Sequence, residues 1–321
     1  MQYSVDYFSA IVESAMAAIE YPSTARRLFE PIKYTLESGG KRLRPVLLLS
    51  VFSALSRREP SEAINQALAV EMFHNFTLLH DDVMDNADLR RGRPTVHRRW
   101  NENAAILSGD TMLTMASQLL AMCPPEKLPE LCRVFNDTAI GVYQGQQLDM
   151  EFERRNDVSV SEYLEMIKLK TSVLLAGACA LGAVMAGASE ADRTHLYNYG
   201  LALGIAFQLR DDWLDTYGDP AIFGKEIGGD IINRKKTWLL ITGLEESDGE
   251  LAAIMEEDLV PNERVEQVRR LFDSLGLSER LGRLAAEYSA KAVEELAKVE
   301  MDNDARKFFE SLVVKAATRT H

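Results

Sequence analysis

The sequence predicts an all-α protein that folds as a single domain over residues 1–321. Three observations support this prediction. Apolar residues recur at helical spacing through most of the chain, as in helices that pack on a core. No segment shows sustained strand-like alternation or the βαβ pattern of a parallel sheet. No linker rich in proline or serine divides the chain, and 46% of its residues are hydrophobic, which is enough for a large core.

The helical segments are predicted as follows. The first one that we place begins after Ser61, a plausible N-cap that follows Pro60. Pro124 and Pro125 separate two later helices. The segments near the C-terminus are amphipathic and charged, which favours positions on the outside. The predicted ranges are 62–85, 104–122, 126–152, 161–189, 192–217, 236–257, 262–274 and 277–318.

Three stretches are predicted to be irregular, and each borders a charged cluster. Residues 38–40 (Ser-Gly-Gly) lead into a basic run at 41–45. Residues 86–95 are polar and basic, and residues 218–230 are rich in glycine. Glycine permits backbone conformations that other residues avoid. We therefore expect these stretches to form loops beside the charged clusters.

Residues 171–189 carry no charge and nearly reach the length of a membrane-spanning helix. Two interpretations are open, a membrane span and a buried core helix. The segment is rich in alanine and glycine rather than leucine and isoleucine, and no aromatic belt flanks it. These features favour a helix buried in a helical protein, with small residues that let its neighbours approach closely. We therefore predict no integral membrane span.

Net charge and cysteine content limit which partners this protein is expected to bind and which cellular compartment suits it. The net charge of −13 should repel nucleic acid and anionic lipid, so an anionic substrate requires a local basic cluster and a metal. Cys123, Cys132 and Cys179 are odd in number and lack CxxC spacing. They indicate a reduced cytoplasmic protein without a disulfide framework or zinc site. The N-terminus lacks the pattern of a signal peptide.

Three aspartates, Asp81, Asp82 and Asp85, end an apolar helix. On a helix Asp81 and Asp85 lie on one face, about 6 Å apart along the axis. Carboxylates this close repel one another unless a cation neutralises them. Magnesium binds one or two carboxylates and often completes its shell with substrate phosphate. The alternative is a solvated acidic helix end paired with Arg90 and Arg91, although acids at a helix C-terminus oppose its dipole.

The same spacing recurs at Asp211, Asp212 and Asp215, again near the end of an apolar helix. One such cluster is weak evidence, because acidic pairs are common. Two clusters, each followed by a basic or glycine-rich stretch, strongly favour magnesium sites that hold the diphosphate of a substrate.

The sequence resembles the trans-prenyl diphosphate synthases, or polyprenyl synthetases, over nearly its whole length. The resemblance rests on an ordered set of motifs: GGKRLRP at 39–45, LHDDVMD at 79–85, RRG at 90–92, GQQLD at 145–149, KT at 170–171, FQLRDD at 207–212 and GKEIGGDI at 224–231. It implies an isoprenoid-synthase-type helical bundle around a central cavity, usually as a homodimer. It also implies head-to-tail condensation of isopentenyl diphosphate with an allylic diphosphate.

By this resemblance the two aspartate clusters face each other across the cavity and hold about three magnesium ions on the allylic diphosphate. The metals and nearby cations stabilise the leaving diphosphate, and C1–O cleavage leaves an allylic cation. Isopentenyl diphosphate attacks that cation and a proton is lost. The resemblance assigns the role of base to the released diphosphate.

The resemblance also divides the remaining polar residues between two diphosphate sites. Lys41, Arg44, His74 and Arg91 match the isopentenyl diphosphate site. Arg90, Lys170, Thr171, Gln208 and Lys225 match the allylic site, and Lys235 adds a further contact. The predicted catalytic residues are two lysines and five aspartates: Lys170, Lys225, Asp81, Asp82, Asp85, Asp211 and Asp212. Asp215 is predicted as a metal ligand only. His80 and His97 are expected to orient neighbouring groups.

Phe73, Phe76 and Thr77 precede the first cluster and share one helical face. In the family these positions line the tunnel for the growing chain, and a bulky residue acts as its floor. Phe76 stands where long-chain synthases tend to have a small residue, which favours a C15 or C20 product. The alternative is that both phenylalanines are core residues. The first motif lacks the two-residue insertion of many bacterial farnesyl synthases.

Other functions compete with a short-chain synthase. A medium- or long-chain synthase differs only in its tunnel. A class I terpene cyclase shares the fold, but it has no need of a second diphosphate site such as Lys41, Arg44 and Arg91. A non-catalytic partner subunit tends to lose its aspartates, whereas this chain keeps all six. A helical scaffold without a ligand leaves the paired acids unexplained.

Overall fold

The computed structural model describes residues 3–218 and 227–318, and it confirms the predicted all-α class. The chain forms two compact units, which we describe separately. Unit 1 contains residues 1–136, 177–194 and 300–305. Unit 2 contains residues 137–176, 195–299 and 306–321. The assignment of residues 1–321 to one domain stays a prediction.

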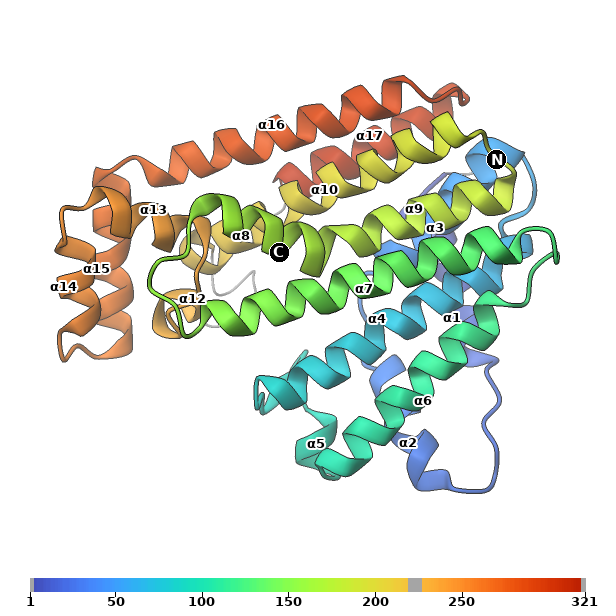
Figure 1. Ribbon diagram of the computed structural model, residues 1–321, viewed down its shortest axis with the longest axis horizontal. Coiled ribbons are helices and arrows are strands. Elements are labelled where there is room, and N and C mark those ends of the chain that lie inside the picture. Colours follow the sequence, from blue (N-terminus) through green and yellow to red (C-terminus); the bar gives the residue numbers. More distant parts are fainter. Residues whose placement is uncertain (1–2, 219–226, 319–321) are drawn as a thin grey trace. The chain divides into compact units, whose positions relative to one another are not determined.

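Unit 1 is built mainly from the N-terminal helices (Figure 1). Helix α4 packs between α3 and α6, which brings the end of the first aspartate helix beside α6. The elements that begin in this part of the chain are α1 (Val5–Ala17), α2 (Arg26–Leu36), α3 (Leu43–Ser56), the 3₁₀ turn η1 (Pro60–Ala63), α4 (Ile64–Met84), α5 (Val96–Arg99) and α6 (Glu102–Leu120).

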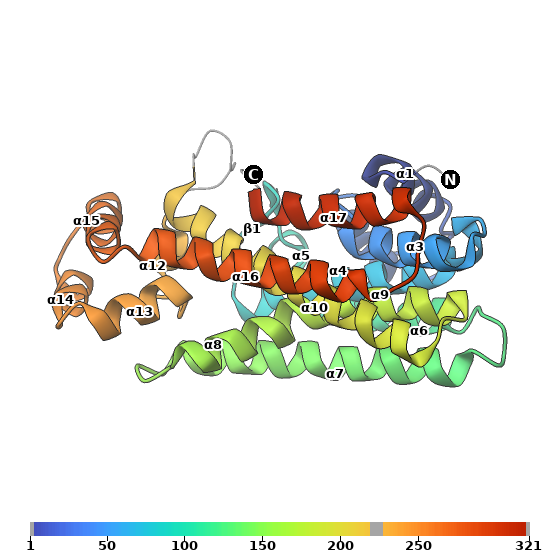
Figure 2. The ribbon, with the colours of Figure 1, turned by 90° about the horizontal axis from the view of Figure 1, so that it is seen from above.

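Unit 2 holds most of the chain after residue 136. Its α16 and α17 run alongside each other and are joined by a short connection (Figure 2). From α7 onward the elements are α7 (Leu128–Phe152), α8 (Val160–Ile167), the π-helical turn η2 (Lys168–Ser172), α9 (Val173–Ala186), α10 (Glu190–Tyr217), α12 (Gly229–Ile232), α13 (Trp238–Glu246), α14 (Glu250–Glu256), α15 (Pro261–Ser274), α16 (Leu277–Ala297) and α17 (Asn303–Thr318).

A small β-hairpin interrupts the stretch that we predicted to be irregular at 86–95. Strand β1 (Leu89–Arg90) pairs antiparallel with β2 (Arg93–Pro94). The two residues between the strands, Arg91 and Gly92, have φ of 53° and 73°. Positive φ at both central residues is typical of the tight turn whose twist matches a hairpin. The hairpin folds the basic run back toward the end of α4.

Several predicted helix boundaries were wrong. Ser61 is no N-cap of α4, because it lies inside η1 and α4 begins after Ala63. The helix predicted over 277–318 breaks near Asp302, whose side chain accepts a hydrogen bond from the Ala305 amide and so starts α17. The helix predicted over 236–257 is interrupted before α14 by Gly249, whose φ is 89°. Helices α1, α2 and α3 were not predicted.

The predicted apolar helix is present but is interrupted by η2. Val160–Ala186 is long and apolar enough to cross a membrane by length and composition. However, 78% of its most apolar window is buried inside the protein, which favours the core-helix interpretation. We expected small residues to let neighbouring helices approach this helix closely. Such an approach occurs within unit 1 between α9 and α3, where a Cβ at Gly182 would lie 2.4 Å from the Leu48 carbonyl oxygen. Glycine is therefore required there.

Candidate active site

The first aspartate cluster lies at the C-terminal end of α4 in unit 1. Asn86, with φ of 52°, ends the helix. Its backbone amide donates to the Val83 carbonyl and the Ala87 amide donates to the backbone carbonyl of Asp82, as in a Schellman motif. The hairpin then brings Arg90 back, and its Nε donates to Asp82 Oδ1 at 2.7 Å. Burial raises the pKa of Asp82, and Arg90 partly offsets this effect.

His80 fixes the same end of α4 to α6. Its Nε2 lies 3.2 Å from the carbonyl oxygen of Ile106. A Cβ at Gly109 would come within 2.2 Å of that nitrogen, so only glycine leaves room for the ring. These contacts tie the end of α4 to α6, and the expected orienting role of His80 stays a prediction.

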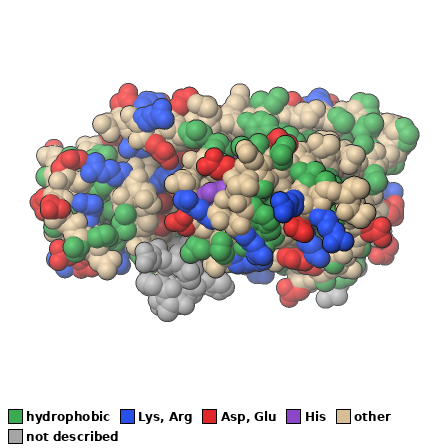
Figure 3. Space-filling model, turned by 90° about the horizontal axis from the view of Figure 1, so that it is seen from below, with side chains coloured by type: hydrophobic (Ala, Val, Ile, Leu, Met, Phe, Trp, Pro, Cys, Tyr) green, Lys and Arg blue, Asp and Glu red, His purple; other side chains and the backbone are tan. Residues whose placement is uncertain are grey.

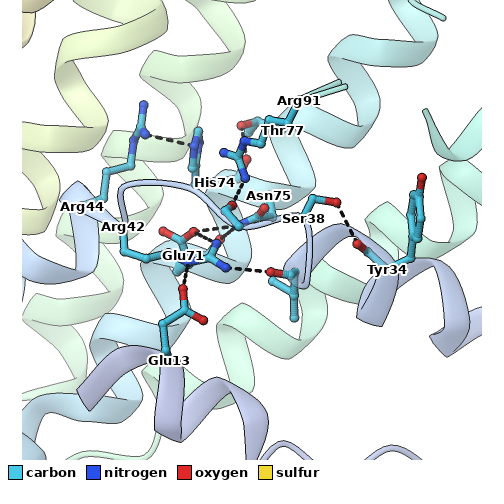
Figure 4. A network of polar contacts seen from close by, with 12 residues as sticks. Glu13, Tyr34, Ser38, Arg42, Arg44, Glu71, His74, Asn75, Thr77 and Arg91 are labelled. Atoms are coloured by element: carbon cyan, nitrogen blue, oxygen red, sulfur yellow. Dashed lines mark hydrogen bonds and ion pairs between the residues drawn. The ribbon is translucent and has the colours of Figure 1, made fainter. Parts of the chain in front are cut away.

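Arg44, His74 and Arg91 of the predicted isopentenyl diphosphate site come together in unit 1 (Figure 4). Arg44 Nη1 donates to His74 Nε2 at 3.0 Å, and Arg91 donates to the Gly39 carbonyl. Gly40 has a φ of 133°, a backbone conformation that side chains with a Cβ rarely adopt, which explains the glycine. Lys41 is exposed.

Burial lowers the pKa values of both arginines of this basic group, and Glu71, whose carboxylate is bonded to Arg42, only partly offsets that effect. Burial lowers the pKa of Arg44 to about 10, and Arg91 adds to that effect. Burial and the same arginines hold the pKa of His74 well below its usual range, so the ring is neutral. The protein's net charge is −13, yet Lys and Arg side chains gather locally on the face shown in Figure 3. A bound anion would stabilise the group around Arg44.

Arg42 has a structural role. It lies in the basic run at 41–45, between Lys41 and Arg44 of the predicted isopentenyl diphosphate site. It is buried, and its guanidinium donates to Glu13, Glu71 and the Leu36 carbonyl, each at 2.7 Å (Figure 4). The Asn75 amide donates to the same Glu71 oxygen. These contacts fix the loop before α3 and therefore the start of the helix that carries Arg44.

The second aspartate cluster lies on α10 in unit 2. Asp212 is buried, with 5% of its surface exposed. Its Oδ2 accepts a hydrogen bond from the Tyr163 hydroxyl, and its Oδ1 accepts one from Gln208 Nε2 at 2.9 Å. Burial raises the pKa of Asp212 to about 7; the two hydrogen bonds oppose the rise, and Asp211 and Asp215 add to it.

Sequence reasoning missed two residues of this cluster. Tyr163 of α8 is one, and no spacing signal pointed to it. Asp230 is the other: its amide donates to Asp215 Oδ2 at 2.9 Å. Burial, Asp212 and Asp215 raise the pKa of the Asp230 carboxyl. Its place in the glycine-rich run after α10 was a usable signal.

Lys170 and Thr171 lie on the π-helical turn η2 of unit 2, and π turns are common at functional sites. Lys170 Nζ donates to Asp149 Oδ2 at 2.6 Å, and Lys235 donates to Glu153 at 2.8 Å. Thr171 Oγ1 donates to Gln208 Oε1 at 3.0 Å. The structure therefore connects Lys170, Thr171, Gln208 and Lys235 to one carboxylate-rich region. Lys225 lies outside the described residues.

The predicted chain-length residues lie on α4, where Phe73 and Phe76 are buried and Thr77 is half-buried. Phe73 packs edge-on against Phe135, with ring centroids 5.3 Å apart. Phe76 lies edge-on to His80 at 4.7 Å, one turn before the first aspartates. Thr77 donates to the His74 carbonyl. Phe73 is therefore part of the core of unit 1, while Phe76 adjoins the metal-site end of α4.

The aspartate carboxylates of the two clusters are donors that suit magnesium. In the part of the chain that the structure describes, no three His, Cys, Asp or Glu side chains converge on one point. Magnesium needs only one or two carboxylates and completes its shell with water and phosphate. Mutual repulsion around Asp212 and Asp230 is what a divalent cation would relieve. One cluster belongs to unit 1 and the other to unit 2, and their apposition stays a prediction.

A family model, a related sequence and solved structures all indicate the same kind of protein. Residues 25–275 match the family model described as polyprenyl synthetase. A geranylgeranyl diphosphate synthase from Methanosarcina mazei is 37% identical over 290 residues, which are 90% of this chain and 89% of that protein. A crystal structure of a geranylgeranyl pyrophosphate synthase is 39% identical and covers 100% of both chains with a TM-score of 0.95. A polyprenyl synthase from Caulobacter crescentus CB15, complexed with calcium and isoprenyl diphosphate, is 30% identical, covers 99% of this chain and 98% of its own, and gives a TM-score of 0.85.

Proposed function

This chain belongs to the polyprenyl synthetase family, and from this premise we propose that it condenses isopentenyl diphosphate head-to-tail with an allylic diphosphate. The reaction depends on magnesium, releases diphosphate and yields an all-trans prenyl diphosphate. Its product is short, C15 to C20, because Phe76 stands in front of the first aspartate cluster.

The basic group of unit 1 carries the proposal. Arg44 and Arg91 donate to an imidazole and to a backbone carbonyl rather than to carboxylates. Burial lowers the pKa of Arg44 by more than the charge of Glu71 raises it, and Glu71 is itself bonded to Arg42. A diphosphate supplies that charge and matches the fork geometry of guanidinium groups. A cation site separate from the aspartates is what a two-substrate condensation requires.

The aspartates Asp81, Asp82, Asp85, Asp211, Asp212 and Asp215 would hold the metal. Bound magnesium would polarise the allylic diphosphate and stabilise its departure. The protein's own cations also stabilise the leaving group. Arg90, held by Asp82, and Lys170, held by Asp149, keep fixed positions beside carboxylates. Such fixed charges need little reorganisation as the leaving group gains charge.

Three alternatives are less well supported. A terpene cyclase has no use for the basic group around Arg44. A long-chain synthase requires an open tunnel where Phe76 is buried against His80. A non-catalytic subunit would not need the six aspartates.

The deciding experiment supplies the purified protein with magnesium, labelled isopentenyl diphosphate and one primer at a time: dimethylallyl, geranyl or farnesyl diphosphate. The expected products are C15 or C20 prenyl diphosphates. Arg44→Gln should raise the KM for isopentenyl diphosphate more than that for the primer. No elongation with any primer rejects the synthase, and a cyclic hydrocarbon favours the cyclase.

The same proposal includes a homodimer in the cytoplasm. Ile140, Tyr143 and Met150 form an exposed apolar stripe on one face of α7 in unit 2; Ile140 is 55% exposed. A second copy would bury this stripe, because exposed apolar residues in a row mark interaction surfaces. Cys123, Cys132 and Cys179 are free thiols, which suits a reducing compartment.

A further inference from the structure

Tyr34, near the end of α2, has no role in the function proposed above, yet it contacts the segment that carries Arg90 and Arg91. Its side chain is buried, with 8% of the residue exposed. Its hydroxyl donates to the carbonyl of Pro94 on β2 at 2.8 Å. All these residues belong to unit 1. A buried tyrosine hydroxyl needs a partner, so this hydrogen bond ties α2 to β2.

The ring of Tyr34 also contacts two guanidinium groups. The guanidinium carbon of Arg93, on β2, lies 4.0 Å from the ring centroid, and that of Arg99, on α5, lies 4.4 Å away. Cations this close to the face of an aromatic ring are attracted by its quadrupole. Trp100 packs edge-on against the same ring, with centroids 5.3 Å apart. Tyr34 therefore holds α2 against both the hairpin and the helix that follows it.

The hairpin needs such support, because it has only two residues in each strand and a two-stranded hairpin is marginally stable by itself. On the β1 side, Arg90 donates to Asp82 of α4. On the β2 side, the contacts come from the end of α2. Besides Tyr34, the Ser38 hydroxyl accepts from Arg93 Nη1 at 3.3 Å and donates to the Tyr34 carbonyl at 2.9 Å (Figure 4).

Arg91 lies in the turn between the two strands, so its position follows from that of the hairpin. Arg91 also donates to the carbonyl of Gly39, which follows α2 in the chain. Strand pairing places Arg90 opposite Arg93, and the turn joins these two residues. A displacement of β2 from α2 would therefore move Arg91.

Tyr34 acts on the arginine rather than on a substrate. Tyr34 and Arg91 line one cavity of about 20 Å³. A cavity of that size has room for about one water, which is too small for a diphosphate. Tyr34 is thus a support behind the hairpin and no ligand of the substrate.

We propose that Tyr34 is a positioning residue that holds the β1–β2 hairpin against α2 and so places Arg91 where its guanidinium binds isopentenyl diphosphate. This inference rests on the proposed function, in which Arg90 contacts the allylic diphosphate instead. A ligand group that is already in place loses less freedom on binding. Loss of Tyr34 should affect Arg91 more than Arg90, because Arg90 keeps its own contact with Asp82 at 2.7 Å.

The test measures the dissociation constant of isopentenyl diphosphate by calorimetry. Tyr34→Phe removes the hydroxyl and keeps the ring, and it should raise this constant about three- to tenfold, the range for one hydrogen bond. Tyr34→Leu also removes the ring from Arg93 and Arg99 and should raise the constant at least about threefold further. The KM for geranyl diphosphate should stay within about twofold of wild type in both variants.

Tyr199→Phe is the matched control. Tyr199 is also fully buried, and its hydroxyl donates to a backbone carbonyl, that of Phe309, at 3.0 Å. Tyr199 lies on α10 in unit 2 and not beside the hairpin. This change should leave the dissociation constant of isopentenyl diphosphate within about twofold of wild type.

A double-mutant cycle tests whether the effect passes through Arg91. In an Arg91→Gln background, Tyr34→Phe should raise the dissociation constant by less than about twofold. In an Arg44→Gln background it should keep its full effect, because Arg44 lies on α3 and not on the hairpin. Equal effects in the two backgrounds would overturn the proposal. So would equal constants in Tyr34→Phe and Tyr199→Phe, or an equal rise in KM for both substrates, since Tyr34 would then only stabilise the fold.

Binding and turnover together separate this inference from the function. A wild type that binds isopentenyl diphosphate but forms no product would reject the synthase, and the binding constants would still decide the role of Tyr34. A wild type that forms product, with binding unchanged in Tyr34→Phe, would reject the role of Tyr34 and keep the synthase.

Discussion

His74 and Arg44 share a hydrogen bond in unit 1, and burial changes the proton affinity of both residues. Burial, followed by the neighbouring arginines, lowers the pKa of His74 well below its usual 6.5. The folded protein therefore binds this proton less tightly than the unfolded chain does. The stability that the neutral ring provides is complete above about pH 6.5 and is lost as the pH falls below that value.

The first prediction concerns this pH dependence. Below about pH 6.5, His74 should reduce the free energy of unfolding by at most about 1.4 kcal/mol per pH unit. Urea unfolding between about pH 5 and 7 measures this slope. His74→Gln should have a shallower slope than wild type, because the other titrating groups are the same in both. Identical slopes would show that His74 is protonated normally in the folded protein.

The second prediction concerns Phe76. Its ring lies beside His80 at the end of α4, so Phe76→Ala should deepen the tunnel and lengthen the products from labelled isopentenyl diphosphate by one or more C5 units. The cost in stability should be about 3–5 kcal/mol, the usual range for a buried phenylalanine. Phe52→Ala, at a fully buried phenylalanine of α3, is the matched control and should leave product length unaltered. An unchanged product spectrum in a folded Phe76→Ala protein would assign Phe76 to the core alone.

At the scale of elements, close contacts between helices place the catalytic groups. In unit 2, the turn η2 lies against Gly145 of α7: a Cβ there would come within 2.2 Å of the Lys170 nitrogen and 2.5 Å of its Cα. These neighbours are backbone atoms, which cannot move aside as a flexible side chain would. The approach of α7 therefore sets the position of both Lys170 and its partner Asp149.

The third prediction follows from this contact. Gly145→Ala should displace η2, lower stability by about 1–3 kcal/mol through overpacking, and reduce kcat, because Lys170 would leave its hydrogen bond with Asp149. Gly282→Ala in α16 is a matched control, since nothing lies within 4 Å of its added Cβ. That change should raise stability by about 0.5–1 kcal/mol. Equal melting temperatures and activities in the two variants would contradict the proposed role of Gly145.

At the scale of the whole molecule, each unit contains one aspartate cluster with its own cations. The proposed reaction requires that both clusters serve one diphosphate. Bound metal and diphosphate would stabilise the folded chain by mass action. The proposed dimer adds a second association, through the exposed stripe on α7.

The fourth prediction tests that dimer. Ile140→Lys places a charge at the most exposed residue of the α7 stripe, where it would be buried without a partner in the dimer, and should raise the dimer dissociation constant at least about tenfold. Analytical ultracentrifugation over a range of concentrations measures this constant. Val314→Lys on α17 is the control, because Val314 is also exposed, at 59%, but lies outside the stripe. A monomeric wild type, or equal effects of both changes, would exclude this interface.

Local spacing was enough to predict the helical class and the two aspartate clusters. Asp81 and Asp85 share a face because helical geometry relates residues four apart, whatever surrounds them. The glycines at 39–40 and 92 likewise marked turns before any contact was known. Helix boundaries near Ser61 and Asp302 were less predictable, because capping competes among several nearby polar groups.

Long-range contacts had to come from the tertiary structure. Tyr163 and Asp212 are 49 residues apart in sequence, and no periodicity relates them. The same holds for Arg42, whose place in the basic run gave no sign that it is bonded to Glu13 and Glu71. The sequence by itself determined which helices carry the carboxylates and cations, because that depends on neighbours along the chain. The tertiary structure decided which of these groups are buried and paired, because desolvation and hydrogen bonding depend on neighbours in space.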